Sequence, residues 1–92
     1  MKKVFCWGTF DIIHKGHIEF LKFARDQGDH LTVIVISDKA VMENKSRNPI
    51  NFQNVRAENL KKVESVDDTL TPSDFDESCK IISSVKPDVF VF

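Results

Sequence analysis

Apolar, strand-forming segments alternate along this chain with segments whose apolar residues recur at helical spacing. This alternation restricts the fold more than any other feature of the sequence. Residues 4–7 form a short apolar run, and residues 31–37 (LTVIVIS) are almost all β-branched or leucine. The second run does not alternate with polar residues, as expected for a strand that is covered on both faces. Residues 86–92 (KPDVFVF) end the chain in another run of this kind. These runs predict a parallel sheet.

Three helices are predicted between the strands. The first spans about residues 16–27, and Gly28 is expected to follow it in the left-handed conformation that often ends a helix. The expected inner faces of the three helices are Ile18, Leu21 and Ala24; Phe52, Val55, Leu60 and Val63; and Phe75, Cys79, Ile82 and Val85. The third helix lies within residues 71–85 and has a proline near its start.

The remaining segments complete a β-α-β-α-β-α-β order. Residues 38–51 read as a polar loop that begins with a short helical turn, and residues 66–70 read as a brief strand. This order predicts an α/β fold with right-handed crossovers, in which ligands bind outside the carboxyl ends of the strands.

Composition narrows the class of protein. The 92 residues are predicted to form one small domain, residues 1–92, and a formal net charge of −1 gives no electrostatic case for binding nucleic acid or a membrane surface. Cys6 and Cys79 are far apart and form no CxxC pair, so two buried thiols in a reducing compartment are expected. The first apolar run is too short for a signal peptide, and we therefore expect a cytoplasmic protein.

The first strand-to-helix junction carries the string GTFDIIHKGH, residues 8–17. Backbone N–H groups at a glycine turn and at a helix N-terminus favour phosphate, and His14 and His17 can add hydrogen-bond donors there. Such an arrangement suits phosphoryl transfer, which depends mainly on positioning and charge stabilisation. The same two histidines could instead bind zinc or simply be exposed. The residues alone leave these alternatives open, and the junction is neither a P-loop nor a GxGxxG turn.

The string GTFDIIHKGH resembles the signature of the cytidylyltransferase-like nucleotidyltransferases, whose HxGH motif follows a G-x-F-D turn. Members include glycerol-3-phosphate cytidylyltransferase, archaeal FAD synthase and heptose-phosphate adenylyltransferase. The segments ARDQGDHLTVIVISD, KSRNPINFQNVRAENLKKVESVD and KPDVFVF resemble further parts of these proteins in the same order. The resemblance implies a Rossmann-like parallel sheet with helices on both faces.

Roles for individual residues follow from this resemblance. His14 and His17 would contact the nucleotide phosphates and act in catalysis together with Lys45. The implied nucleotide-binding set is Gly8, Thr9, Phe10, Asp11, His14, Gly16 and His17. Asp11 would either hold the turn or assist near the metal. Lys45 and Arg56 would bind the acceptor, whereas solvated surface charges are the alternative for both. Arg47 is a further candidate for neutralising phosphate.

The implied reaction transfers CMP or AMP from CTP or ATP to a phosphorylated small molecule. Pyrophosphate leaves, and Mg²⁺ bridges phosphate oxygens. Family members continue beyond the fourth strand with a glycine-acidic segment and an ISSTxxR-type segment, so this chain is expected to lack the last strand and helix of the family fold. It would then be a fragment or a short form, and the alternatives are a non-catalytic nucleotide-binding module or a structural domain without a ligand. The resemblance also implies a possible homodimer.

Overall fold

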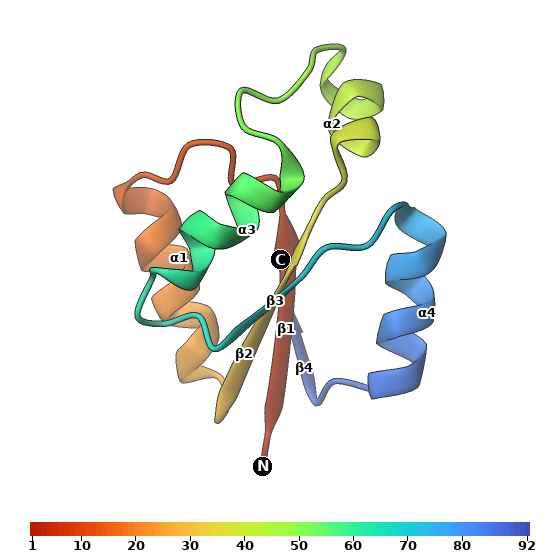
Figure 1. Cartoon of the computed structure of the whole chain (residues 1–92). Coiled ribbons are helices and arrows are strands. Elements are labelled where there is room, and N and C mark those ends of the chain that lie inside the picture. Colours follow the sequence, from red (N-terminus) through yellow and green to blue (C-terminus); the bar gives the residue numbers. More distant parts are fainter.

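A four-stranded parallel sheet forms the centre of the computed structural model, which describes all 92 residues (Figure 1). The strand order is β3-β2-β1-β4, and all three neighbouring pairs are parallel. The elements in chain order are β1 (Lys3–Gly8), α1 (Lys15–Asp26), β2 (His30–Val35), α2 (Asp38–Lys45), α3 (Gln53–Lys61), β3 (Asp68–Leu70), α4 (Phe75–Val85) and β4 (Val89–Val91). The predicted parallel α/β architecture is confirmed.

Helices cover both faces of the sheet, as the sequence predicted. In Figure 1, α1 and α3 lie on one side of the strands and α4 lies on the other, while α2 stands beyond the carboxyl ends of β1 and β2. The main core fills the space between the sheet and the α1–α3 layer. Its fully buried members are Val4, Cys6, Leu21, Ala24, Leu31, Val33, Val35 and Leu60. This core holds the carboxyl ends of β1 and β2 side by side, which is where a ligand site is expected.

An aspartate directly precedes each of the strands β2, β3 and β4 and fixes its register at the amino end of the sheet. The carboxylates of Asp29, Asp67 and Asp88 accept the backbone N–H groups of Lys2, Leu31 and Lys3, at 2.7, 2.8 and 2.7 Å. Each aspartate also donates its own N–H to the carbonyl of the same residue. Because a parallel pair has no hairpin turn to set its register, these paired bonds supply that alignment.

Gly28 does not adopt the left-handed conformation that the sequence predicted. No glycine in the structure has a positive φ, and helix α1 instead ends at Gln27 in a right-handed conformation. A Cβ at position 28 would lie 2.6 Å from a methyl group of Val4 and 2.8 Å from the Lys2 carbonyl oxygen. The glycine is therefore required for close approach to β1. The left-handed helix ends are Ser46 and Lys86.

Several sequence-based helix predictions were wrong in detail. Residues 38–45 form a two-turn helix, α2, where a loop with only one turn was expected. Phe52 and Val55 are exposed, and the buried face of α3 is formed by Arg56, Ala57 and Leu60. Because an arginine lies at the centre of that face, the spacing of the apolar residues alone does not identify it.

The inner face of α4 also differs from the prediction. Ser78 is its buried residue, whereas Phe75 and Cys79 are exposed. The expectation of two buried thiols therefore holds only for Cys6, whose pKa is raised to about 12 by burial. A thiol with so high a pKa is a packing group rather than a nucleophile.

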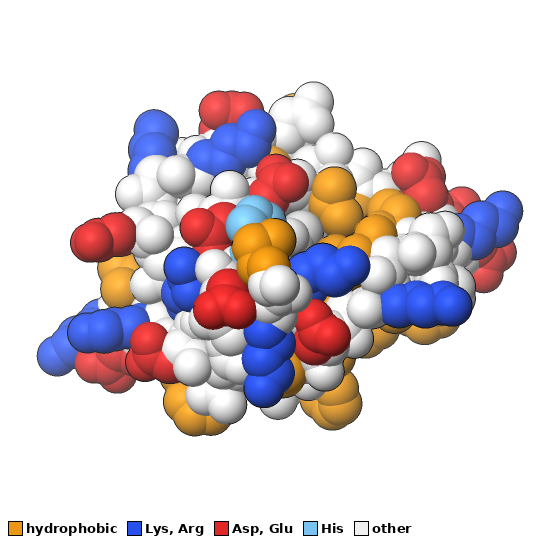
Figure 2. Space-filling model, turned by 90° about the horizontal axis from the view of Figure 1, so that it is seen from below, with side chains coloured by type: hydrophobic (Ala, Val, Ile, Leu, Met, Phe, Trp, Pro, Cys, Tyr) orange, Lys and Arg blue, Asp and Glu red, His pale blue; other side chains and the backbone are white.

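The end of the molecule that carries the N-terminus shows no patch of a single charge. Figure 2 views this end from below, and basic and acidic side chains are interspersed across it. No helix in the structure combines the length and the apolar character that crossing a membrane requires.

Candidate functional site

His14 and His17 lie together at the N-terminus of α1, where each ring is held by the backbone. The His14 Nδ1 accepts the N–H of Gly16 at 3.0 Å, and the His17 Nδ1 accepts the N–H of His14 at 3.3 Å. The two rings stack with centroids 3.8 Å apart and planes 23° apart. Because Nδ1 acts as an acceptor in both rings, a neutral imidazole carries its proton on Nε2. Each ring can then offer an Nε2–H donor to an anion.

Gly8 and Phe10 set the position of the second histidine. Phe10 is buried and has a φ of 48°, which is unusual for a side chain of this size. Its ring lies so close to Gly8 that an added Cβ would be 2.6 Å from a ring carbon, and its edge meets the His17 ring at a centroid distance of 5.3 Å. Strained backbone of this kind is concentrated at functional sites.

The pKa of His17 lies below its ordinary value. Partial burial is the main cause, and the charges of His14 and Lys45 act in the same direction, while the nearby Ile12 backbone acts in the opposite direction. His17 is therefore neutral at pH 7, in agreement with its role as an acceptor at Nδ1.

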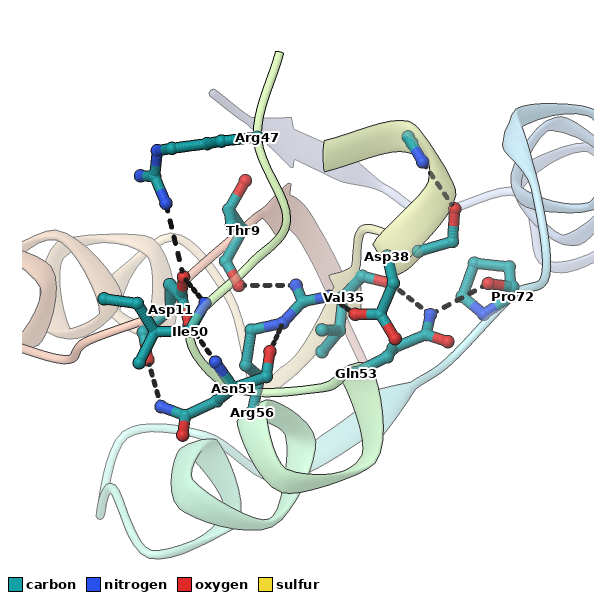
Figure 3. Close-up of polar contacts among 12 residues, drawn as sticks. Thr9, Asp11, Val35, Asp38, Arg47, Ile50, Asn51, Gln53, Arg56 and Pro72 are labelled. Atoms are coloured by element: carbon teal, nitrogen blue, oxygen red, sulfur yellow. Dashed lines mark hydrogen bonds and ion pairs between the residues drawn. The ribbon is translucent and has the colours of Figure 1, made fainter. Parts of the chain in front are cut away.

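Asp11 ties the motif to a loop about forty residues further along the chain. Its carboxylate oxygens accept the N–H groups of Ile50 at 2.7 Å and Asn51 at 2.8 Å, and the Asn51 side chain returns a bond to the Asp11 carbonyl at 2.8 Å (Figure 3). Desolvation alone would raise the pKa of Asp11, but these two N–H bonds and the charges of Arg56 and Arg47 lower it overall. These contacts favour the turn-holding alternative for Asp11, and a role near the metal stays a prediction.

Arg56 is completely buried beneath the motif and bonds three separate segments. Its guanidinium donates to the Asn51 carbonyl at 3.0 Å, the Thr9 carbonyl at 2.9 Å and the Asp38 carboxylate at 2.7 Å (Figure 3). The alternative of a solvated surface charge is therefore wrong for Arg56, whose side chain is 0% exposed. Its placement behind the turn favours a positioning role, and contact with an acceptor stays a prediction.

The bond from Arg56 to Thr9 has a consequence for the next residue. In a trans peptide the C=O and the following N–H point in opposite directions. With the Thr9 carbonyl drawn inward to Arg56, the Phe10 N–H is directed away from the guanidinium, and it has no hydrogen-bond partner within the protein. This N–H is a free donor on the motif.

Basic side chains face the motif across an open cavity of about 310 Å³. Residues 8–12 and His17 line one side, and Lys45, Arg47 and Ile50 line the other. Lys45 is the last residue of α2, and Arg47 lies 3.9 Å from the Asp11 carboxylate. Of the predicted residues, the structure brings together around this space Gly8, Thr9, Phe10, Asp11, His17, Lys45 and Arg47. Arg56 is buried behind it, and His14 and Gly16 do not line it, although the His14 ring stacks on that of His17. This cavity combines histidine, backbone and cationic donors and suits a polyphosphate.

Three residues that hold the site were not predicted from the sequence: Asp38, Asn51 and Gln53. The Gln53 amide donates to the Val35 carbonyl at 2.9 Å and the Pro72 carbonyl at 2.8 Å, which joins the end of β2 to the segment before α4. All three act through contacts that are distant in the sequence, and no local motif marks such residues.

Metal binding by the protein alone is not supported by the arrangement of its side chains. No group of three or more His, Cys, Asp or Glu residues is placed to hold a metal ion. The zinc alternative for the histidine pair therefore lacks the further ligands it would need. Mg²⁺ is commonly bound by substrate phosphates with one or two carboxylates, so this arrangement fits a metal that enters with a nucleotide.

Comparisons with known proteins agree with this geometry. A profile of the cytidylyltransferase-like family matches residues 5–92. The FAD synthase of Pyrococcus horikoshii is 46% identical over 87 residues, which cover 95% of this chain and 59% of that protein. The FAD synthase of Thermococcus kodakarensis is 43% identical over 89 residues. The chain thus spans little more than half the length of these relatives.

A solved structure shows the same fold. The lipopolysaccharide core biosynthesis protein from Thermoplasma volcanium aligns with a TM-score of 0.87 and 34% identity, over 98% of this chain and 72% of that one. The present chain thus corresponds to 72% of that neighbour's length. With the family profile covering nearly every residue and the motif built as described, the chain belongs to the cytidylyltransferase-like family.

Proposed function

We propose that this chain binds the triphosphate of ATP at the N-terminus of α1 and transfers AMP to a phosphorylated small molecule, with release of pyrophosphate. The observation that carries the proposal is the stacked pair His14 and His17, whose Nδ1 atoms are held by backbone N–H groups. This leaves Nε2–H donors at a helix N-terminus that itself favours anions.

The protein's part in the reaction is to position and neutralise phosphate. The two Nε2–H groups and the free Phe10 N–H would donate to phosphate oxygens as negative charge shifts during attack on the α-phosphorus. Lys45 and Arg47, on the opposite side of the cavity, would hold the phosphate of the acceptor and oppose its repulsion by the triphosphate. No protein nucleophile is needed, because the acceptor phosphate attacks directly.

ATP is preferred to CTP because the curated relatives are named FAD synthases, and FAD contains an AMP unit. Mg²⁺ bound to the triphosphate would withdraw charge from the phosphate oxygens. Asp11 would have to share its oxygens between that ion and the backbone N–H groups of Ile50 and Asn51, which they already accept.

Pyrophosphate release from ATP and Mg²⁺ in the presence of flavin mononucleotide (FMN) tests the proposal. The informative variant is His14→Asn, because asparagine is a good N-cap and should keep the bond from Gly16 while removing the imidazole donor. We expect activity to fall about 100-fold or more, as when one preorganised donor is removed. The matched control is His30→Asn, at the amino end of β2.

A second measurement separates catalysis from nucleotide binding. Nucleotide binding is measured independently as stabilisation of the chain against heat by ATP and Mg²⁺. Stabilisation without pyrophosphate release would favour the alternative of a non-catalytic nucleotide-binding module. Equal activities for His14→Asn and His30→Asn would exclude the role given to the histidine pair.

A further inference from the structure

Helix α2 is attached to the rest of the molecule mainly at its start. It stands beyond the carboxyl ends of β1 and β2, and Val41 is its only buried residue, so little apolar packing holds it in place (Figure 1). The carboxylate of Asp38, the first residue of the helix, accepts a hydrogen bond from Arg56 at 2.7 Å. No other side chain of α2 forms a hydrogen bond or an ion pair with another element. The orientation of the helix therefore depends on this bond.

The far end of α2 carries Lys45, which lines the phosphate cavity. Residues 46–48 are exposed, so this end has no comparable anchor. A helix rises about 1.5 Å per residue, which places Lys45 about 10 Å along the axis from Asp38. Tilting the helix by about 10° at its first residue would move the backbone of Lys45 by about 2 Å, enough to lose a hydrogen bond.

Arg56 joins this helix to the opposite wall of the cavity. One terminal nitrogen of its guanidinium donates to the Thr9 carbonyl at 2.9 Å, and the other donates to Asp38 (Figure 3). The first bond sets the direction of the Phe10 N–H, and the second holds the start of α2. Because a guanidinium is planar and rigid, its two terminal nitrogens keep these partners at a fixed separation. One buried group thus aligns the backbone donor on one wall with Lys45 on the other.

The negative charge of Asp38 allows its two possible effects to be told apart. A carboxylate near an anion site repels phosphate, so a purely electrostatic effect would make phosphate binding stronger when the carboxylate is removed. A residue that acts by position has the opposite effect, because its removal displaces a group that binds the anion. The direction of the change in affinity therefore distinguishes the two effects.

We propose that Asp38 is a positioning residue for phosphate binding, because its bond with Arg56 fixes α2 so that Lys45 faces the free Phe10 N–H across the cavity. This inference rests on the proposed function, in which Lys45 holds the phosphate of the acceptor. Asp38 itself touches no ligand. Its effect on the acceptor passes through Lys45.

A double-mutant cycle between Asp38 and Lys45 tests this inference, with the dissociation constant of FMN measured from the flavin fluorescence. Asp38→Ala should weaken FMN binding about tenfold, as expected for the loss of one charge-assisted hydrogen bond. In a Lys45→Met background the same substitution should change the affinity by less than about twofold. General damage to the site would weaken binding in both backgrounds, so the cycle separates positioning from a purely structural role.

Two further variants separate the bond of Asp38 from its charge. Glu43→Ala is the matched control, because it removes an exposed carboxylate from the same helix. It should leave FMN binding unchanged or slightly stronger. Asp38→Asn keeps an oxygen that can accept the Arg56 N–H and should bind FMN at least as tightly as the wild-type chain. Affinity in Asp38→Asn as low as in Asp38→Ala would contradict the positioning role.

Asp38→Ala should still fold, because Asp38 is 39% exposed and water can reach the vacated position at Arg56. A thermal transition checks this point. If the transition is absent, Asp38→Glu replaces this variant, since its carboxylate still pairs with Arg56 while the extra methylene shifts the start of α2. It should also weaken FMN binding only when Lys45 is present.

Equal losses with and without Lys45 would overturn the inference and leave the proposed function intact. Equal FMN affinity in Asp38→Ala and Glu43→Ala would do the same. If the wild-type chain did not bind FMN, the acceptor role of Lys45 would fail, and this inference with it. Thermal stabilisation by ATP and Mg²⁺ would then show whether the nucleotide-binding part of the proposed function stands.

Discussion

Replacing the buried guanidinium of Arg56 should destabilise the whole chain, and the size of the effect follows from its three contacts. In Arg56→Met the side chain keeps most of its volume but loses its donors to Thr9, Asn51 and Asp38. Asp38 is 39% exposed and can turn to water, so its share is small. The Thr9 and Asn51 carbonyls belong to half-buried residues, and an acceptor left unpaired away from water costs about 1 to 3 kcal/mol. We therefore expect a loss of about 3 kcal/mol.

Urea unfolding gives a direct measurement of this loss. Trp7 is the only tryptophan, so its fluorescence reports the transition without ambiguity. With a slope of about 1.5 kcal/mol per molar urea, the midpoint should fall by about 2 M. A chain of this length has a total stability of about 5 to 14 kcal/mol, so the variant should still fold in the absence of urea.

Arg47→Met is the matched control, because it removes the same guanidinium group from a side chain that is 54% exposed. The Arg47 guanidinium lies 3.9 Å from the Asp11 carboxylate, which is too far for a hydrogen bond. The free energy of unfolding of this variant should change by less than about 0.5 kcal/mol, which corresponds to a midpoint shift of less than about 0.3 M. Similar midpoints for the two variants would refute the reasoning, as they would mean that the bonds made by Arg56 are replaced by water at no cost.

Two other perturbations follow from the geometry. In Gly28→Ala the new methyl group would meet Val4 and the Lys2 carbonyl, so the same urea assay should show a loss of about 1 to 3 kcal/mol, and an unchanged midpoint would remove the close-approach explanation. Burial is the main cause of the lowered pKa of His17 in the folded chain. At pH values between this lowered pKa and about 6.5, the unfolded chain therefore binds a proton at His17 more readily than the folded chain does. The contribution of His17 to the free energy of unfolding is therefore complete above about pH 6.5 and is lost as the pH falls below it. In His17→Gln the amide oxygen can still accept the His14 N–H. The thermal midpoint of this variant should fall less on acidification than that of the wild-type chain.

The sheet was predictable because β1, β2 and β4 consist mainly of continuous apolar residues, whereas β3 is a short strand with only one apolar residue. The motif was equally evident, since Gly8, His14 and His17 are close in sequence and their roles are local. Helix α3 was harder to describe correctly. Its buried face is centred on Arg56, and a charged residue is read from sequence as exposed unless its partners are known.

Contacts between distant segments account for the rest of what the sequence did not reveal. The bonds from Asp11 to residues 50 and 51 depend on the path of a loop, and nothing in either segment marks the pairing. Gly28 illustrates the same limit in another way. A glycine after a helix usually indicates a left-handed residue, whereas here it is needed because β1 passes close by.

The bonds of Asp11 and Arg56 also bear on the order in which the chain becomes competent during synthesis. Thr9 and Asp11 are made early, yet their partners at Ile50, Asn51 and Arg56 follow some forty residues later. A nascent chain that has just completed GTFDIIHKGH contains every residue of the motif. It still lacks the groups that orient the Thr9 carbonyl and the Asp11 carboxylate. The turn can reach its final shape only after the start of α3 has been made and has docked, so its formation depends on slow, long-range loop closure rather than on local structure.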